Sequence, residues 1–523
     1  MKTIRILAFS SAVLMAASGA MAQITWDGNG DANNSGNWND AVNWDTDTVP
    51  TSTENATLGS VTSGTRTVTV DVATTVNRII FDQDNADGIN KLSLSGSLTL
   101  NRTNASLTNA IWTVNLSGGA TVANVVTDLN GYRIIVANAY NSNVPSIYLA
   151  GTVNLNAEGS GVGRSAGGWF GIAVNGIVNV TANGSFYRTG TQTAGMPVLF
   201  NAGSQVNVLD SVFTIYSEGN PTSGRGLHIT NNGSVTINAG ATLSHQLTSN
   251  TTSTTGGEVS FTVNSVGSVL QAGTYEMKAL HGNTTYTPNA TITNNGTWTV
   301  DGAGAVIRRL DTGDATKFIM PAFNIAAAGT LRGNSTSDTL EFNEQTADGT
   351  RRMMLTNNGT IAPGAGSQGA GLASIGNLIL RDIDVTMGSH ANATVALDIG
   401  GAAIGQFDRL TLANGTTAGA GAGTLALDGN GTLQMYKVNG FDPGTTPFSI
   451  TLIQAGSISG QFATVKLDSD TFTANELDVG GGLKYTLTYN SDSVVLSYIP
   501  EPGTVGLLLG GFALALIRRR MRG

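Results

Sequence analysis

The 523-residue sequence contains no cysteine and has few charged residues. Without cysteine the chain forms no disulfide, binds no metal through thiolates and has no thiol nucleophile. Charged residues make up 12% of the sequence, about half the share usual in soluble proteins. The 26 basic and 35 acidic residues leave a formal net charge of −9. Because nucleic-acid binding requires a basic surface, we expect no nucleic-acid partner.

Helical patterns are also scarce in the body of the chain, because its 68 glycines interrupt the longer apolar stretches. Short runs of valine, isoleucine, leucine and threonine alternate with polar residues instead, which is typical of β-strands. The hydrophobic share is 40%, too high for a disordered chain of low hydrophobicity. These patterns predict an all-β protein.

The sequence Thr-Asn-Asn-Gly recurs at a constant interval. Its three copies lie at 230–233, 293–296 and 356–359, so the interval is the same both times. We interpret this interval as three coils of about 21 residues each, within the range of solenoid repeats. Asparagine and glycine tolerate the left-handed backbone conformation that tight turns need. The alternation that follows places Val235 and Ile237 on one face of a strand.

A single short strand cannot bury such a face, whereas stacked coils form a continuous core. We therefore predict an elongated parallel β-helix over residues 61–390. Strand signals at short intervals continue in 391–498, which we expect to form a C-terminal β-rich module. The alternative is a series of antiparallel sandwiches with Asn-Gly hairpins.

The predicted N-terminal cap, residues 23–60, contains half of the six tryptophans of the chain, Trp26, Trp38 and Trp44. Its W-x-G, N-W and N-W pattern resembles the opening of autotransporter-like, repeat-rich bacterial surface proteins. The region 391–498 resembles the C-terminal part of the same proteins. Two roles are open for the tryptophans: shielding the first open coil of the solenoid, or stacking on sugar rings as a glycan contact.

Residues 1–22 have the features of a secretory signal peptide. Lys2 and Arg5 precede an apolar stretch, and Ala20 and Ala22 form a small-x-small cleavage signature. We expect export through the Sec translocon and cleavage after Ala22.

A second unusual segment, residues 499–523, ends the sequence. Pro500, Glu501 and Pro502 are expected to extend neither a strand nor a helix, because each proline lacks an N–H donor. The uncharged run 503–517 predicts a short transmembrane helix. Four arginines follow as the expected membrane stop: Arg518, Arg519, Arg520 and Arg522.

This order of Pro-Glu-Pro, apolar helix and arginine-rich end resembles the PEP-CTERM sorting signal. The resemblance covers only 499–523 and implies an exosortase-like enzyme that recognises the segment near 500–502. It further implies a Gram-negative, exopolysaccharide-producing bacterium. The expected precursor is anchored in the inner membrane, and the processed protein is at the cell surface or extracellular. Exopolysaccharide is a candidate partner.

No catalytic residues, metal ligands or cofactors are predicted. The four histidines, His228, His245, His281 and His390, show no ligand or triad spacing. Asp82, Asp84 and Asp87 miss the EF-hand pattern, because the third acid falls one place late. The expected role is structural or adhesive. The alternative is a polysaccharide-binding or polysaccharide-degrading β-helix, for which the densest charged group runs from Arg308 to Asp314.

Overall fold

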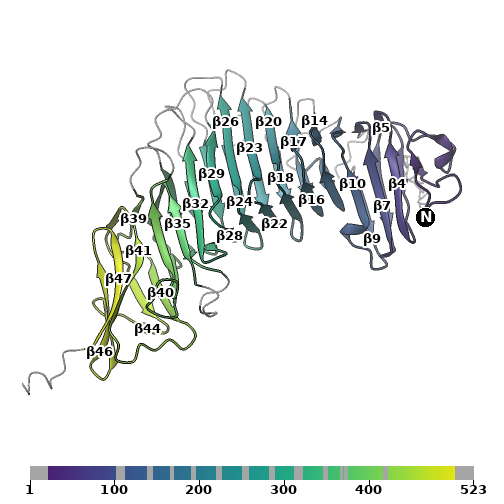
Figure 1. The fold of residues 1–523 in the computed structure, drawn as a ribbon. Helices are drawn as coiled ribbons and strands as arrows, with labels where there is room; N and C mark the ends of the chain where they lie inside the picture. Colours follow the sequence, from purple (N-terminus) through teal and green to yellow (C-terminus); the bar gives the residue numbers. More distant parts are fainter. Residues whose placement is uncertain are drawn as a thin grey trace, which may run out of the picture.

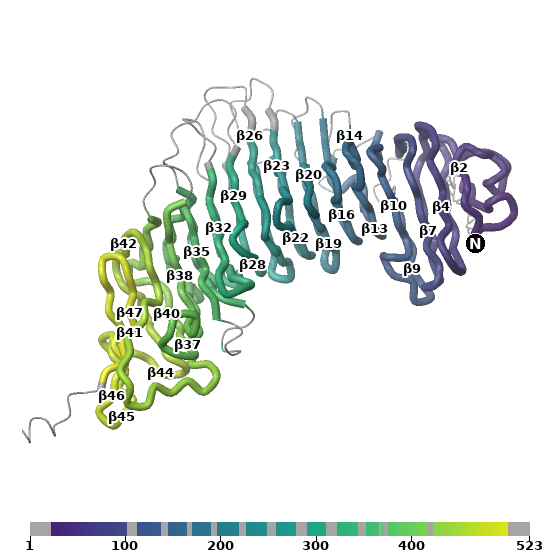
Figure 2. Tube along the Cα trace, in the orientation of Figure 1, coloured from purple at the N-terminus to yellow at the C-terminus, as the bar shows by residue number. Residues whose placement is uncertain are grey.

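The computed structural model describes residues 22–101, 112–137, 145–164, 170–189, 196–218, 226–249, 258–281, 289–310, 322–344, 352–365, 369, 375–415 and 422–500. In this part of the chain the protein is a parallel β-helix. Its strands stack side by side along an elongated body, from the purple N-terminal end to the yellow C-terminal end (Figures 1 and 2). The all-β prediction and the solenoid body are therefore confirmed.

Three long sheets form the faces of the β-helix, and a short sheet accompanies them at the N-terminal end. Sheet I contains, in spatial order, β2 Gly36–Asn37, β4 Gly64–Val70, β7 Gly88–Leu94, β10 Val125–Asp128, β13 Thr152–Leu155, β16 Ile177–Val180, β19 Gln205–Val208, β22 Ser234–Ile237, β25 Ser268–Gln271, β28 Thr297–Val300, β31 Thr330–Gly333, β34 Thr360–Ala362, β37 Thr394–Ile399, β40 Thr432–Lys437, β43 Thr464–Leu467 and β44 Asp470–Thr471. Sheet II contains β5 Thr74–Val76, β8 Leu98–Leu100, β11 Arg133–Val136, β14 Ser160–Arg164, β17 Gly184–Arg188, β20 Val212–Glu218, β23 Thr242–Ser249, β26 Thr274–His281, β29 Ala305–Leu310, β32 Ser337–Glu344, β35 Asn377–Arg381, β38 Arg409–Ala413, β41 Phe448–Gln454, β47 Ser493–Pro500, β46 Leu483–Tyr489 and β45 Glu476–Gly480.

Sheet III contains β12 Ile147–Leu149, β15 Ile172–Val174, β18 Met196–Phe200, β21 Leu227–Asn231, β24 Glu258–Val263, β27 Asn289–Asn294, β30 Ala322–Ile325, β33 Met353–Asn357, β36 Ile383–Met387, β39 Thr424–Ala426 and β42 Ser457–Ser459. The short N-terminal sheet contains β1 Gln23–Thr25, β3 Asn55–Leu58, β6 Arg78–Gln83 and β9 Trp112–Leu116. Two single-turn 3₁₀ helices, η1 Ala41–Asn43 and η2 Val122–Asn124, connect strands.

One coil of the β-helix passes through sheets III, I and II in that order. The strands β21, β22 and β23 make one such coil, and β24, β25 and β26 make the next. Coils pair in parallel, and antiparallel strand pairs occur in the described residues only near the C-terminal end, among β41, β43, β44, β45, β46 and β47. The alternative of antiparallel sandwiches is therefore wrong.

The predicted coil length is also wrong. Ser234 pairs with Ser268 of the next coil, and Ser268 pairs with Thr297 of the coil after that. Two coils thus carry the chain from position 234 to 297, which equals the interval from one Thr-Asn-Asn-Gly copy to the next. The interval therefore spans two coils rather than three. Coil length varies along the chain, since the partners Thr152 and Ile177 lie closer together in the sequence than Ser234 and Ser268.

A single hydrophobic core runs through the β-helix from Ile24 to Tyr498. Alternating side chains point inward, as the buried positions of Val235 and Ile237 show. The sheets continue across residue 391, where β37, β38 and β39 extend sheets I, II and III. Beyond them β45, β46 and β47 form an antiparallel meander on sheet II.

Pro500 differs from the expectation that it extends no strand, because it is the last residue of β47 and pairs with Leu483. A proline at the end of a strand removes only one N–H from the ladder, which a sheet tolerates. Glu501, Pro502 and the four terminal arginines lie outside the described residues, as do Ala20 and the rest of 1–21. In the described part of the chain, no helix is both long and apolar enough to span a bilayer.

Candidate functional site

The three N-terminal tryptophans are buried in the core, with exposed fractions of 1% for Trp26 and 0% for Trp38 and Trp44. Trp44 makes edge contacts with both others, at ring-centroid distances of 5.2 Å to Trp26 and 4.8 Å to Trp38. Its indole N–H donates to the Trp38 carbonyl oxygen at 2.8 Å. A tryptophan that stacks on a sugar must expose a ring face, so the glycan-contact prediction for these residues is wrong.

Arg66 joins this N-terminal region to the following coils. Its guanidinium is fully buried and donates to the carbonyl oxygens of Ala32 and Gly59 and to the side-chain oxygen of Asn90, at 2.5, 2.7 and 2.7 Å. Burial lowers its pKa to about 10. Nothing in the sequence around Arg66 indicates its role.

The predicted cleavage residue Ala22 is exposed and directly precedes β1. Its carbonyl oxygen accepts the Asn55 N–H at 2.9 Å. β1 begins at the next residue, Gln23, and is the first strand of the N-terminal sheet.

The Thr-Asn-Asn-Gly repeat places an asparagine inside the β-helix at every second coil. Along one interior column Asn231, Asn294 and Asn357, all fully buried, alternate with apolar residues such as Val263 and Ile325. Each asparagine accepts the N–H of the glycine two residues later, at 3.0 to 3.1 Å. Each also donates to a carbonyl oxygen in the next coil, at 2.8 to 3.0 Å. The repeat is therefore a device for satisfying buried backbone groups at a corner.

The glycine of each repeat is needed for close approach rather than for a left-handed backbone. The residues with positive φ among those described do not include Gly233, Gly296 or Gly359. A Cβ on Gly296 would lie 2.2 Å from the Gly267 carbonyl oxygen, and a Cβ on Gly359 would lie 2.3 Å from that of Ala326. Neighbouring coils pack so closely at this corner that no side chain fits.

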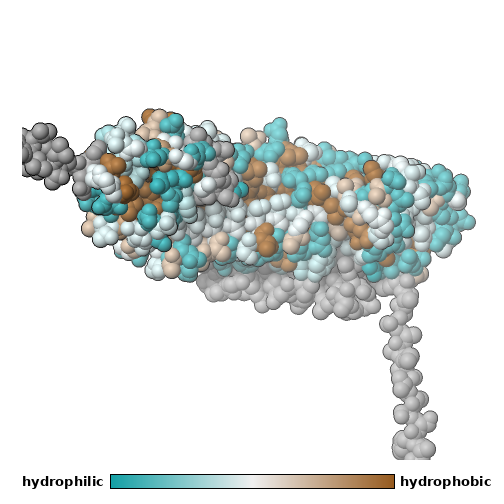
Figure 3. All heavy atoms as spheres, turned by 90° about the horizontal axis from the view of Figure 1, so that it is seen from below, coloured by the Kyte–Doolittle hydropathy of each residue, from teal (hydrophilic) through white to brown (hydrophobic). Residues whose placement is uncertain are grey.

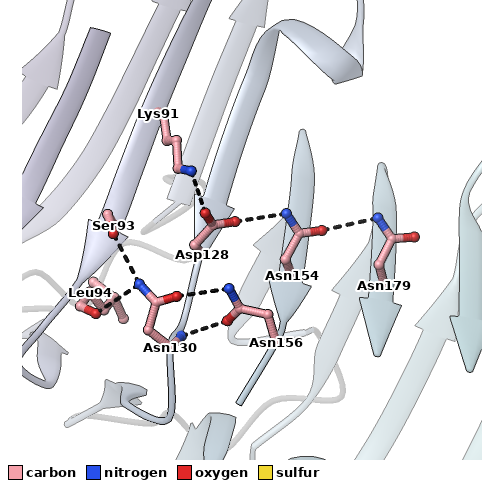
Figure 4. A network of polar contacts seen from close by, with 8 residues as sticks. All are labelled: Lys91, Ser93, Leu94, Asp128, Asn130, Asn154, Asn156 and Asn179. Carbon is pink, nitrogen blue, oxygen red and sulfur yellow. Dashed lines mark hydrogen bonds and ion pairs between the residues drawn. The ribbon is translucent and has the colours of Figure 1, made fainter. Parts of the chain in front are cut away.

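A ladder of side-chain amides follows the outer face of sheet I (Figure 4). Asn207 donates to Asn179, Asn179 to Asn154, and Asn154 to Asp128, at 2.9, 3.0 and 2.8 Å. Asp128 also forms an ion pair with Lys91 at 2.5 Å, which neutralises the end of the ladder. Such a chain of polarised hydrogen bonds stabilises the stacking of consecutive coils.

Hydroxyl side chains form a second regular array on the same sheet. Eight consecutive strands present one at equivalent positions, namely Ser234, Ser268, Thr297, Thr330, Thr360, Thr394, Thr432 and Thr464. All are half-buried, and successive hydroxyls are one strand spacing apart, about 4.8 Å. The column carries no charge. Figure 3, which views the molecule from below, shows hydrophilic and apolar side chains interspersed rather than a continuous apolar face.

In the described part of the chain, the pair that most resembles a hydrolase dyad is His228 with Ser260, at 2.7 Å between Nδ1 and Oγ. The Gly226 N–H donates to Nε2 of His228. Nε2 is therefore the unprotonated nitrogen, and Nδ1 carries the proton and donates it to Ser260. Burial lowers the pKa of His228, so the ring is neutral at neutral pH. A histidine in this tautomer cannot take a proton from Ser260.

His245 is enclosed in the core, where its ring nitrogens contact the Tyr275 hydroxyl and the Leu227 carbonyl oxygen, both at 3.0 Å. Burial lowers its pKa to about 3. His390 is exposed, and His281 ends β26. Asp311 and Asp314 lie outside the described residues.

One buried carboxylate, that of Asp408, accepts hydrogen bonds from the backbone. Asp408 accepts the backbone N–H groups of Gly376 and Asp398, at 2.7 and 2.8 Å. Burial raises its pKa to about 8, and the nearby Asp398 carboxylate adds to the rise. Within the described ranges, no group of three or more histidine or acidic residues is placed to hold a metal ion.

No protein-family model and no curated protein matches the chain. The fold and the residues described above therefore carry the functional argument.

Proposed function

We propose that the protein is an exported structural or adhesive component of the cell surface or extracellular matrix. An exosortase-like enzyme sorts it through the Pro-Glu-Pro signal. The observation that carries the proposal is the three-part ending, with its apolar run and arginine-rich end, directly after the last strand of the body. β47 ends at Pro500, at the end of the β-helix opposite the N-terminal cap (Figure 1).

The body suits a structural role, because one continuous core and hydrogen-bonded ladders hold successive coils in a rigid stack. In sheet II, fifteen strand spacings at about 4.8 Å each give a body on the order of 70 Å long. If the C-terminal end is held at the membrane, the N-terminal cap is displayed farthest from it.

The sorting proposal predicts that Glu501→Ala changes the location of the protein in its native host. The unaltered protein is expected in the surface or extracellular fraction, and the variant in the inner-membrane fraction. Glu158→Ala is the matched control, because Glu158 is an exposed acid on a turn of the body. Fractionation and immunoblotting measure the result. Identical distributions of the Glu501→Ala variant and the unaltered protein would show that the signal is not used.

A second candidate function, polysaccharide binding, is favoured by the uncharged hydroxyl column on sheet I. Regularly spaced hydroxyls on a rigid face can exchange hydrogen bonds with the hydroxyls of an extended neutral polysaccharide. The proposed glycan contact is therefore the hydroxyl column, and not Trp26, Trp38 and Trp44.

The polysaccharide proposal predicts that two acidic substitutions in the column, Thr297→Glu with Thr330→Glu, weaken binding to host exopolysaccharide about tenfold, equivalent to ~1.4 kcal/mol. Co-sedimentation with the purified polysaccharide measures the affinity. Thr46→Glu with Thr48→Glu adds the same charge on an exposed N-terminal loop and is expected to change nothing. Equal binding by the two double variants would remove the hydroxyl column from consideration.

A further inference from the structure

Two arginines occupy adjacent positions in the interior of the β-helix. Arg164 is the last residue of β14 and Arg188 the last residue of β17, and the two are direct register partners in sheet II. Two residues earlier the partners are Val162 and Phe186, both fully buried in the core. Because side chains alternate along a strand, both arginines point to the same inner side. Their exposed fractions are only 7% and 1%.

Arg164 lacks hydrogen-bond partners that a buried guanidinium needs. Its Nε and Nη1 atoms are buried and have no acceptor among the described residues. In the buried Arg66 only Nε lacks an acceptor, and the two Nη atoms donate to three oxygens. Arg188 donates from Nη1 to the Ser217 hydroxyl oxygen at 3.3 Å. A buried donor without an acceptor costs free energy, and a buried charge costs more.

The electrostatic environment of the pair is unfavourable for two positive charges. Burial lowers the pKa of Arg164, and burial with the added charge of Arg164 lowers the pKa of Arg188 to about 10. Elsewhere among the described residues, Arg308 pairs with Glu276 at 3.7 Å and Arg352 with Asp384 at 3.3 Å.

We propose that Arg164 and Arg188 form a binding site for an oxyanion group: phosphate, sulfate or carboxylate. Planar guanidinium groups bind such groups through paired N–H donors, and the Nε and Nη1 atoms of Arg164 supply donors of this kind. The Ser217 hydroxyl, in the next coil, adds a neutral hydrogen-bonding group beside Arg188. The bound negative charge offsets the repulsion between the guanidinium groups. This proposal does not depend on the proposed sorting or surface role.

The oxyanion can be a free ion or the acidic group of a sugar, and calorimetric titration separates these sources. The full processed chain is titrated at neutral pH with inorganic phosphate, with sulfate and with glucuronate, against sodium chloride of equal ionic strength. Saturable binding of phosphate or sulfate alone identifies a free ion, and binding of glucuronate identifies a sugar carboxylate. Both results support the site. Absence of saturable binding for all three probes overturns it.

Variants assign any binding to the arginine pair. Arg164→Gln is expected to weaken binding by about tenfold or more, because it removes one set of charged donors. Lys466→Gln, with the same charge change on β43, is expected to leave binding unaltered. Arg164→Lys keeps the charge but loses the paired donors, so it is expected to bind with intermediate affinity. If Arg164→Gln does not fold, the binding affinity of Arg164→Lys tests the assignment instead. Binding unaffected by either folded Arg164 variant refutes the assignment.

Discussion

Replacing Trp44 with alanine is expected to destabilise the N-terminal coils by about 3–5 kcal/mol, the cost typical of removing a fully buried tryptophan. Trp44 lies between Trp26 and Trp38 and contacts both rings. Its removal leaves a cavity at the end of the core and deprives the Trp38 carbonyl oxygen of its 2.8 Å hydrogen bond. Because a solenoid is stabilised by neighbour contacts, the loss should be concentrated in the first coils.

Hydrogen exchange resolved along the chain measures this effect, with urea denaturation for the whole protein. Faster exchange is expected in β1, β3 and β4, and little change in strands near the C-terminal end. Trp44→Phe is the control, because it keeps much of the packing and loses the indole N–H; a loss of about 1–2 kcal/mol is expected. Unchanged exchange in Trp44→Ala would show that the tryptophan cluster does not hold the N-terminal end together.

Asn294→Ala is expected to lower the stability of the central coils by about 2–4 kcal/mol, because two buried backbone groups lose their partners. The Asn294 side chain accepts the Gly296 N–H at 3.1 Å and donates to the Thr330 carbonyl oxygen at 2.8 Å. An alanine at this position satisfies neither group. The position is fully buried, so water cannot readily replace the amide.

The matched control is Asn264→Ala, at an outer position where the side chain donates to Asn232 at 2.8 Å. Its removal is expected to cost less than about 1 kcal/mol, since solvent can satisfy the freed groups. Chemical denaturation and exchange of β27, β28 and β30 compare the two variants. Equal losses would mean that burial of the repeat asparagine contributes nothing beyond an ordinary surface hydrogen bond.

The Thr-Asn-Asn-Gly repeat shows what could be predicted from the sequence and what could not. Its interval identified a solenoid, since a constant spacing reflects equivalent positions on stacked units. The number of coils in one interval could not be read, because asparagine alternates with apolar residues along the interior column. The glycine was predicted from its turn conformation, yet the need for it arises from the carbonyl oxygen of a neighbouring coil.

The candidate sites also include residues that the sequence located and residues that only the structure brought together. The sequence located Trp26, Trp38 and Trp44, but only their mutual packing showed that no ring face is free. Arg164 and Arg188 carried no recognisable signal, because they are a whole coil apart in the sequence and become neighbours only when β14 pairs with β17.

By itself, the sequence determined the all-β class, the strand alternation and the terminal motifs that predict export and sorting. These depend on residues close together in the chain, where side-chain period and backbone preference act locally. Only the tertiary structure decided the coil length, the burial of the tryptophans and the pairing of the two arginines. Those features depend on the register between successive coils, whose length varies along the chain, and register is set by core packing that no local pattern specifies.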